Sequence, residues 1–346
     1  MAGPRVTLAT VARQTGVSVA TASKVLNGRP GVSDETREKV RQAMVELGYR
    51  PTTARADSPG EAVERVVVVF DRVDVSMYSA ELLQAMLAAA SSVGIELMIR
   101  LLDVPEATAS GSSLDSWARS LLGGGCQGAI FVTCELEPAQ IEACNRIGLP
   151  MVAVDSQTMM TAGMVTISAD NFSGGMLQAR HLLELGHRRI GVIAGSMSRM
   201  FASERAHGAL AALLDAGVRE PTALLREGHF SHQTGLELGG WLLDLPEPPT
   251  GIVSNSDGCA WGVMEAARLR GLRVPDDVSV VGFDGTQMAH WSAPKLTTVV
   301  QPLGDIARLA VRTIKAMIEG RAPDSSRIQL GTRLLVGNST DVPPRP

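Results

Sequence analysis

The sequence predicts an α/β protein with a small N-terminal head of three helices and a larger body that contains two parallel sheets. Two observations lead to this fold class. In residues 6–47, apolar side chains recur at helical spacings of three and four, in short segments separated by glycine and serine. From Val66 onward, β-branched segments alternate with amphipathic helical segments, and the alternation runs through two series of similar length. Such series favour parallel sheets that are covered by helices on both faces.

The three helices of the head follow from their caps and their apolar stripes. A first helix is expected at residues 8–15, because Gly16 suits a left-handed C-terminal cap. Ser18 can cap a second helix at residues 19–27, and Ser33 can cap a third. The turn between the first two helices is only three residues long, which is typical of a helix-turn-helix.

Charge is distributed unevenly between the head and the body. The whole chain has a formal net charge of −4, yet residues 1–60 hold nine basic and five acidic residues. The head is therefore cationic at +4, and the rest of the chain carries −8. A cationic unit on an anionic body is typical of a protein that binds a polyanion at one end, and nucleic acid is the polyanion we expect.

The second helix of the head is the candidate element for reading DNA. The face that remains when its apolar side chains turn inward carries Val19, Ala20, Ser23 and Lys24. A helix of this kind fits the major groove, where its early residues contact base edges. Phosphate contacts that position the head are expected from Thr7, Ser18, Thr21 and Asn27. The alternative interpretation is that Lys24 is only a solvated lysine and that the serines are only helix caps.

The head also resembles a known family. The segment TLATVARQTGVSVATASKVLNGRPGVSDETREKVRQAMVELGYRP is similar to the DNA-binding head of the LacI/GalR (lactose-repressor/galactose-repressor) family of bacterial transcription regulators. The resemblance implies base contacts from Val19, Ala20 and Lys24. It also implies a homodimer that binds palindromic double-stranded operator DNA, with one head on each half-site.

The resemblance weakens at the segment that follows the head. Family members usually continue with a short hinge helix that ends in a leucine, and this leucine wedges into the minor groove. Here Ser58 stands at the leucine position, and Pro59 and Gly60 follow directly. A serine is not an apolar wedge, and Pro59 opposes helix continuation. Whether this hinge folds as a helix is therefore left open.

The body is expected to contain two successive β–α series. In the first series we expect strands at 66–70, 95–101, 129–132 and 151–154, and helices at 80–92, 113–122 and 138–147. In the second we expect strands at 190–194, 251–254 and 278–283, and helices at 172–185, 203–216, 232–243, 259–270 and 303–318. Ligands of such folds bind beyond the carboxyl ends of the strands, so a cleft between two lobes is the expected site.

The body resembles the effector domain of the same family, which is similar to periplasmic sugar-binding proteins. The segments LLELGHRRIGVIAG, SERAHGALAALLDAG, SDGCAWGVMEAARLRGLRVPDDVSVVGFDG and APKLTTVVQPL carry this resemblance. We expect a head at 1–50, a hinge at 51–64, an N-terminal lobe at 65–168 and 300–332, and a C-terminal lobe at 169–299 and 333–340. The chain would then cross between the lobes near 168–170, 299–302 and 332–334.

The family motifs imply effector contacts from Arg205, Asp257 and Asp284. Carboxylates and guanidinium groups bind the adjacent hydroxyls of a sugar through charge-assisted hydrogen bonds. The alternatives are that Arg205 forms a surface ion pair and that Asp257 chiefly caps a helix. Gly285 stands where the family often has a second aspartate, and this leaves a two-acid ligand clamp in doubt.

Aromatic residues of the body are candidates for stacking on a sugar ring. Tyr78 and Trp291 are the main candidates, and Phe172 and Phe201 are weaker ones. Tyr78 could instead fill the edge of a lobe. Trp261 lies in a helical apolar stripe and is expected in the core, and His290 is expected in a polar loop rather than at a metal.

The sequence favours a DNA-binding transcriptional regulator, most simply a repressor, that is controlled by a small sugar effector. The alternative is a carbohydrate-active or nucleotide-dependent enzyme, but no GxGxxG after a strand, GxxxxGK[ST], GxSxG or HExxH motif occurs. A transport binding protein is a third class, which the missing secretion signal and the basic head argue against. The ending LTTVVQP resembles a family branch found near xylose and plant-polysaccharide utilisation, which favours a pentose or a short oligosaccharide.

Compartment and assembly follow from smaller features. No apolar run approaches the roughly 18 residues that span a bilayer, so no membrane association is expected. Four cysteines without a CxxC pair are expected to be buried, reduced thiols in a cytoplasmic protein that needs neither metal nor cofactor. The proline-rich tail DVPPRP shows no heptads, so we expect a dimer through the faces of the lobes rather than a coiled-coil tetramer.

Overall fold

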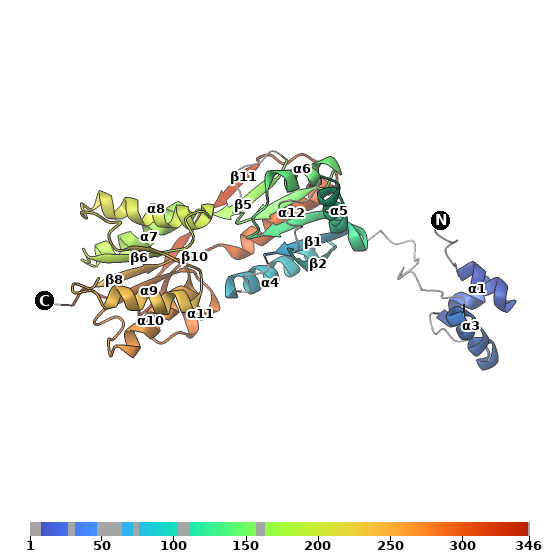
Figure 1. Cartoon of the computed structure of the whole chain (residues 1–346), viewed down its shortest axis with the longest axis horizontal. Coiled ribbons are helices and arrows are strands. Elements are labelled where there is room, and N and C mark those ends of the chain that lie inside the picture. Colours follow the sequence, from blue (N-terminus) through green and yellow to red (C-terminus); the bar gives the residue numbers. More distant parts are fainter. Residues whose placement is uncertain are drawn as a thin grey trace. The chain divides into compact units, whose positions relative to one another are not determined.

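The computed structural model describes residues 8–26, 32–46, 64–71, 76–102, 111–156 and 163–344. It contains two compact units, Met1–Ala62 and Val63–Pro346, which we call the head and the body (Figure 1). The expected hinge lies outside the described residues, apart from Glu64. The α/β fold class and the order of head before body are as predicted.

The head contains the three predicted helices, α1 (Leu8–Thr15), α2 (Val19–Leu26) and α3 (Asp34–Glu46). Gly16 ends α1 with a φ of 69°, the left-handed conformation expected of it. The Ser18 hydroxyl caps α2 by accepting a hydrogen bond from the backbone N–H of Thr21 at 3.0 Å. The core of the head consists of Val11, Ala12, Ala22, Val25, Val40 and Ala43.

The N-terminal lobe of the body is built on a parallel sheet with the strand order β11-β5-β4-β3-β1-β2. Its strands are β1 (Glu64–Phe70), β2 (Ile95–Leu101), β3 (Cys126–Val132), β4 (Met151–Val154), β5 (Val165–Ala169) and β11 (Arg327–Leu330). Its helices are α4 (Met77–Ser92), α5 (Gly111–Leu121), α6 (Pro138–Arg146) and α12 (Leu303–Ile318). Side chains of β1 alternate between the two faces: Val66 and Val68 pack with α4 and α12, and Val67 and Val69 with α5 and α6.

The C-terminal lobe has a second sheet with the order β12-β10-β9-β8-β6-β7. Its strands are β6 (Ile190–Ala194), β7 (Leu225–Glu227), β8 (Gly251–Ser254), β9 (Ser279–Asp284), β10 (Thr297–Val300) and β12 (Arg333–Leu335). Its helices are α7 (Asn171–Glu184), α8 (Met200–Asp215), α9 (His232–Leu243), α10 (Asp257–Leu269) and α11 (Gln287–Trp291). The prediction of two parallel sheets needs one correction, because β12 pairs with β10 in the antiparallel direction.

The chain passes between the two sheets at three places, which Figure 1 lets the reader follow by colour. β5 lies in the first sheet, and the next strand, β6, lies in the second. After β10 the chain returns to the first lobe, where α12 packs against α4. β11 pairs in the first sheet and β12 in the second. The two lobes are therefore joined by three neighbouring segments, which is the connection that a hinged pair of lobes needs.

Two helix pairs of the C-terminal lobe cross at glycines. A Cβ atom on Gly175 of α7 would lie 2.0 Å from the carbonyl oxygen of Arg205 in α8, and one on Gly208 of α8 would lie 2.0 Å from the carbonyl oxygen of Phe172 in α7. Real Cβ atoms do not approach this closely. Each helix therefore presents a glycine to the main chain of its partner, and the position of Arg205 is fixed by this backbone contact.

The pair α9 and α10 repeats the same arrangement. A Cβ atom on Gly235 would lie 1.9 Å from the carbonyl oxygen of Cys259, and one on Gly262 would lie 2.0 Å from that of His232. In both pairs, the contacted carbonyl belongs to the residue three positions before the glycine of the same helix. The sequence RAHG, which lies within the segment SERAHGALAALLDAG quoted above, is one of the four copies of this Xaa-x-x-Gly spacing.

The four cysteines are buried as predicted, and all four thiols are free. Burial raises the pKa of the Cys134, Cys144 and Cys259 thiols to about 12, so that they carry no charge near neutral pH. No helix in the described part of the chain is long and apolar enough to cross a membrane.

Candidate functional site

A cavity of about 540 Å³ in the body is lined by residues of both lobes. Thr133 and Asp155 line it directly after strands β3 and β4, and Asp284 lines it as the last residue of β9. The cavity therefore lies at the carboxyl ends of the strands, where ligands of such folds bind. All three residues have positive φ angles, of 52°, 46° and 115°. Such backbone conformations are unfavourable for residues other than glycine, and they cluster at functional sites.

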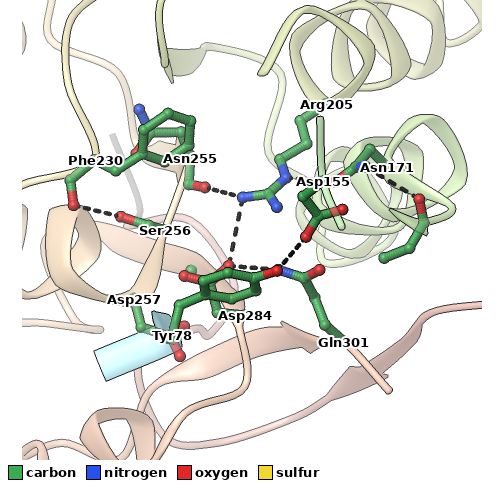
Figure 2. A network of polar contacts seen from close by, with 12 residues as sticks. Tyr78, Asp155, Asn171, Arg205, Phe230, Asn255, Ser256, Asp257, Asp284 and Gln301 are labelled. Carbon is green, nitrogen blue, oxygen red and sulfur yellow. Dashed lines mark hydrogen bonds and ion pairs between the residues drawn. The ribbon is translucent and has the colours of Figure 1, made fainter. Parts of the chain in front are cut away.

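Arg205 is held from several sides on one wall of the cavity (Figure 2). Its Nε donates a hydrogen bond to Asn171 Oδ1 at 2.8 Å, and its Nη1 donates to the backbone oxygen of Asn255 at 2.8 Å. Nη1 also lies 3.4 Å from Asp284 Oδ1, and the guanidinium carbon is 3.8 Å from the centre of the Phe283 ring. Arg205 is buried, so the alternative of a surface ion pair is wrong, and its guanidinium group is preorganised before a ligand binds.

Asp284 faces Arg205 at the end of β9 and also accepts a hydrogen bond from Gln301 Nε2 at 2.7 Å. The pKa of this carboxyl group is raised to about 8, because burial and the nearby Asp257 carboxylate together outweigh the opposite effects of Arg205 and Gln301. The charged form of Asp284 is thus poorly compensated. A ligand that donates hydrogen bonds to this carboxylate would supply what the site lacks.

Tyr78 and Asp155 form the facing wall, which belongs to the N-terminal lobe. The Tyr78 hydroxyl donates a hydrogen bond to Asp155 Oδ2 (Figure 2). The second oxygen, Oδ1, is buried. Burial raises the pKa of Asp155, although the Tyr78 hydrogen bond, Arg205 and a hydrogen bond from the Ala169 backbone favour its charged form. Asp155 therefore places a buried carboxyl group in the wall of the cavity, and a hydroxyl donor on a ligand would stabilise its charged form.

Asp155 was not among the residues predicted from the sequence, although a signal was present. It directly follows the predicted strand at 151–154, just as Asp284 follows the predicted strand at 278–283. An aspartate at the carboxyl end of a strand in a parallel sheet points to a ligand site in both cases.

Asp257 is placed differently from what the family motif implied, because it does not belong to the cavity lining. Its carboxylate accepts hydrogen bonds from the backbone N–H and the hydroxyl of Thr286, at 2.7 and 2.9 Å, and from the hydroxyl of Thr298. The alternative of helix capping is also wrong, since Ser256 caps α10 by accepting from Cys259 N at 3.1 Å. Asp257 instead holds the loop after β9, and with it the position of Asp284.

The aromatic candidates separate into two groups. Tyr78 and Phe201 line the cavity, as expected of them. Trp291 and Phe172 are 72% and 42% exposed, and neither lines the cavity. The expectation that Trp261 lies in the core is wrong, because it is 47% exposed and lines the cavity.

The position of Trp261 depends on which face of its helix packs against the core. In α10 the neighbours Ala260 and Val263 fill the core, so that Trp261 between them faces outward. His290 and Trp291 lie in the short helix α11 rather than in a loop. Among the described residues, no group of three or more His, Cys, Asp or Glu side chains is arranged to hold a metal ion.

The candidate DNA-reading helix of the head has one buried and one exposed face. Ala22 and Val25 of α2 are buried, whereas Val19 is 50% exposed and Ala20 and Lys24 are also exposed. Ser18 and Thr21 hydrogen-bond to each other through their hydroxyls at 2.9 Å, and Ser23 lies in the same helix. The candidates Thr7 and Asn27 lie outside the described residues. The exposed face of α2 is therefore free to contact a groove of DNA, as the prediction requires.

Known proteins are similar to this chain along almost its whole length. Residues 7–52 match the family described as bacterial regulatory proteins, lacI family, and residues 179–340 match the periplasmic binding protein-like domain. The transcriptional regulator DegA of Bacillus subtilis (strain 168) is 32% identical over 339 residues, which are 97% of this chain and 98% of DegA. Catabolite control protein A of Priestia megaterium is 29% identical over 97% of this chain and 99% of its own length.

Solved structures give the same result. The complex of the transcriptional regulator CelR with cellobiose has a TM-score of 0.71 and 28% identity, over 97% of this chain and all of that chain. The lac repressor dimer bound to operator and the anti-inducer ONPF has a TM-score of 0.71 and 26% identity, over 98% of this chain and all of that chain. Together with the identity to DegA over both full chains, these findings show that the protein belongs to the lacI family of bacterial transcriptional regulators.

Proposed function

We propose that the protein represses transcription as a homodimer on a palindromic operator, and that a small sugar bound in the cavity controls its affinity for DNA. The main support for control by a sugar is that both lobes contribute polar side chains to the cavity. Arg205 and Asp284 come from the C-terminal lobe, and Tyr78 and Asp155 come from the N-terminal lobe. A ligand that contacts both pairs prefers one arrangement of the lobes, which is what allosteric control requires.

The chemistry of these side chains supports a sugar. A sugar hydroxyl both donates and accepts, so it can give a hydrogen bond to a carboxylate and receive one from Arg205. Asp155 and Asp284 are buried carboxyl groups whose charged forms are disfavoured by burial, so hydrogen bonds from sugar hydroxyls would stabilise these charged forms. Relatives support the same class, since CelR was solved with cellobiose and the lac repressor with ONPG.

Contacts between the lobes show what a bound sugar would have to change. Asp71 and Arg199 approach to 4.0 Å, Glu204 and Arg327 to 2.7 Å, and the Gln287 N–H donates to Glu81 at 2.7 Å. These pairs are partly exposed, so each contributes about 1 kcal/mol or less. A ligand with a differential affinity of a few kcal/mol can therefore shift the lobes relative to one another.

The dimer is supported by an exposed apolar edge of the N-terminal lobe. Leu87 of α4 is 47% exposed, and Ile99 and Leu101 of β2 are 49% and 52% exposed. β2 is the edge strand of its sheet. An apolar sheet edge is normally covered by another surface, and a second copy of the chain would cover it here. The similar lac repressor was solved as a dimer on its operator.

In the head, the exposed face of α2 supports base contacts from Val19, Ala20 and Lys24. A regulator of this kind works in the cytoplasm, where the chromosome is. The similar proteins named above are regulators, and they support this function over that of an enzyme acting on the sugar.

Band-shift titration of the full-length protein tests the proposal. The probe is a duplex selected by the protein from a library of random palindromes, and the titration is repeated with a panel of pentoses, hexoses and disaccharides. We expect retardation of the duplex, and a change of at least about tenfold in affinity with one sugar. Failure to retard any duplex contradicts DNA binding, and an affinity that no sugar changes contradicts the control by sugar. Sedimentation of the free and DNA-bound protein tests the dimer.

A further inference from the structure

The cavity has two chemically different ends. The polar end is formed by Tyr78, Asp155, Arg205 and Asp284, which are all less than 10% exposed. The aromatic end is formed by His232, Trp261 and Met288, which are half-buried or exposed. The polar end is thus the inside of the cavity, and the aromatic end lies toward solvent. The aspartate and arginine side chains that line the cavity all belong to the polar end.

Trp261 is held in place although it is half exposed. The His232 ring meets it edge-on, with ring centres 5.7 Å apart and planes at 78°. The next residue is Gly262, where an added Cβ would lie 2.0 Å from the carbonyl oxygen of His232, so α9 and α10 cross closely at this point. The backbone on both sides of this aromatic pair is therefore fixed by the close approach of the two helices. A large, rigid apolar side chain at the mouth of a polar cavity is a surface on which a flat ring can stack.

The size of the cavity exceeds what the polar end alone needs. Its volume of about 540 Å³ lies in the range of sites that enclose drug-sized ligands, roughly 300–1,000 Å³. A single sugar ring bound to Arg205, Asp284 and Asp155 would leave the aromatic end uncovered. A second ring that is joined to the first would cover it, because the two ends belong to one continuous cavity.

We propose that the effector is a two-ring glycoside, whose inner ring binds at the polar end and whose outer ring stacks on Trp261. This inference rests on the proposed function and makes the ligand class more specific. The required chemistry of the outer ring is an apolar face, which a second pyranose or an aryl group can offer. Trp261 then determines whether a glycoside with two rings binds more tightly than a single ring, whereas Arg205 and Asp284 bind any ring with suitable hydroxyls.

Calorimetry and tryptophan fluorescence of the full-length protein test this assignment. The probes are D-xylose and D-glucose as single rings, xylobiose and cellobiose as two-ring sugars, and phenyl β-D-glucoside as an aryl glycoside. We expect at least one two-ring probe to bind about tenfold more tightly than its single-ring unit. Trp261→Ala should remove this advantage and leave the single-ring affinity within about twofold, and Trp261→Phe should retain part of it.

Trp291→Ala is the matched control, since Trp291 is also an exposed tryptophan of the C-terminal lobe but does not line the cavity. It should bind all probes as the parent protein does. Single-ring probes that bind as tightly as two-ring probes, or an equal loss of both in Trp261→Ala, would overturn the inference and leave the sugar-controlled regulator intact. If none of the probes binds, the proposed sugar effector fails as well. A preference among the two-ring probes distinguishes an outer sugar from an outer aryl group.

Discussion

The head and the body handle recognition in different ways. In the head, the residues proposed to contact DNA are exposed, and Val19, Ala20 and Lys24 lie outside the core. In the body, the residues proposed to contact the ligand are buried, and Arg205 and Asp284 form part of the folded interior. Recognition and stability are therefore separate in the head and combined in the body.

The difference follows from what each unit can bury. The core of the head is a cluster of valine and alanine side chains from three short helices, and a core of this size cannot enclose a charged group. The body has two sheets covered by helices, which can surround a guanidinium group with a side-chain amide, a backbone carbonyl and aromatic rings. Substitutions at the recognition residues should therefore change binding alone in the head, and both binding and stability in the body.

The largest effect is expected from Arg205→Ala. Removal of the buried guanidinium group deletes its hydrogen bonds to Asn171 and Asn255 and its packing on Phe283, which should lower the free energy of unfolding of the body by about 4 kcal/mol and abolish sugar binding. Urea unfolding and calorimetry measure the two properties. Arg226→Ala is the control, because this arginine stacks on Trp241 at the surface and its loss should have an effect of about 1 kcal/mol or less. If Arg205→Ala lost sugar binding without loss of stability, recognition and stability would be separate in the body too.

Gly235→Ala tests the helix crossing that positions the aromatic end of the cavity. The new Cβ would meet the carbonyl oxygen of Cys259 at 1.9 Å, so α9 and α10 must move apart, at an expected loss of about 3 kcal/mol. Urea unfolding measures this loss. In the control, Gly304→Ala in α12, the nearest atom is the end of the flexible Arg308 side chain, and stability should be unchanged or slightly higher. Equal stabilities of the two variants would show that the crossing relaxes without strain.

The pH dependence of stability tests how Asp284 is buried. Its pKa in the folded state is about 8 and its ordinary value is 3.8, so the folded protein keeps a proton that the unfolded chain releases. Stability should therefore fall as the pH rises from about 4 to about 8, by at most about 1.4 kcal/mol per pH unit. In Asp284→Asn this loss of stability should be smaller, by about 2 kcal/mol between about pH 6.5 and about pH 8. An unchanged slope in this variant, measured by urea unfolding at each pH, would show that Asp284 is charged throughout.

Lys24→Ala tests whether DNA binding by the head is separate from its stability. Loss of this exposed lysine should weaken operator binding by about 1.5 kcal/mol and leave the stability of the whole chain and its sugar binding unchanged. Fluorescence anisotropy with labelled operator measures the affinity. Lys39→Ala in α3 removes the same charge from another exposed position and should have a smaller effect. If both variants weakened binding equally, Lys24 would act only through its charge.

The smallest expected effect is that of Ser18→Ala. Ser18 has two roles in the head, because it is a predicted phosphate contact and also the cap of α2. Ser18 caps α2, so its loss should destabilise the head by about 1 kcal/mol and weaken DNA binding indirectly. Hydrogen exchange of the α2 amides in the full chain measures the opening of this helix. Ser18→Asn keeps a capping acceptor and should exchange as the parent does. Protected amides in Ser18→Ala would show that tertiary packing alone maintains α2.

The elements that sequence patterns located best are those with strong periodicity. The strands at 151–154, 190–194 and 251–254 and the helix at 303–318 have the bounds that were predicted. The prediction missed β5, β7, β10, β11, β12 and α11. β11 and β12 lie at the ends of their sheets and are three or four residues long, and each is stabilised by a partner strand that is distant in sequence. Short segments of this kind carry too little periodicity to be recognised locally.

The sequence by itself determined the α/β class, the separation of a basic head from an acidic body, the helix caps at Gly16 and Ser18, and the family motifs around Arg205 and Asp284. These properties depend on local periodicity, on capping and on total charge, all of which can be read along the chain. Only the tertiary structure decided that Asp257 supports a loop, that Trp261 faces the cavity and that Asp155 meets Tyr78. The reason is that burial and hydrogen-bond partners depend on which segments meet, and the residues concerned are up to 77 positions apart.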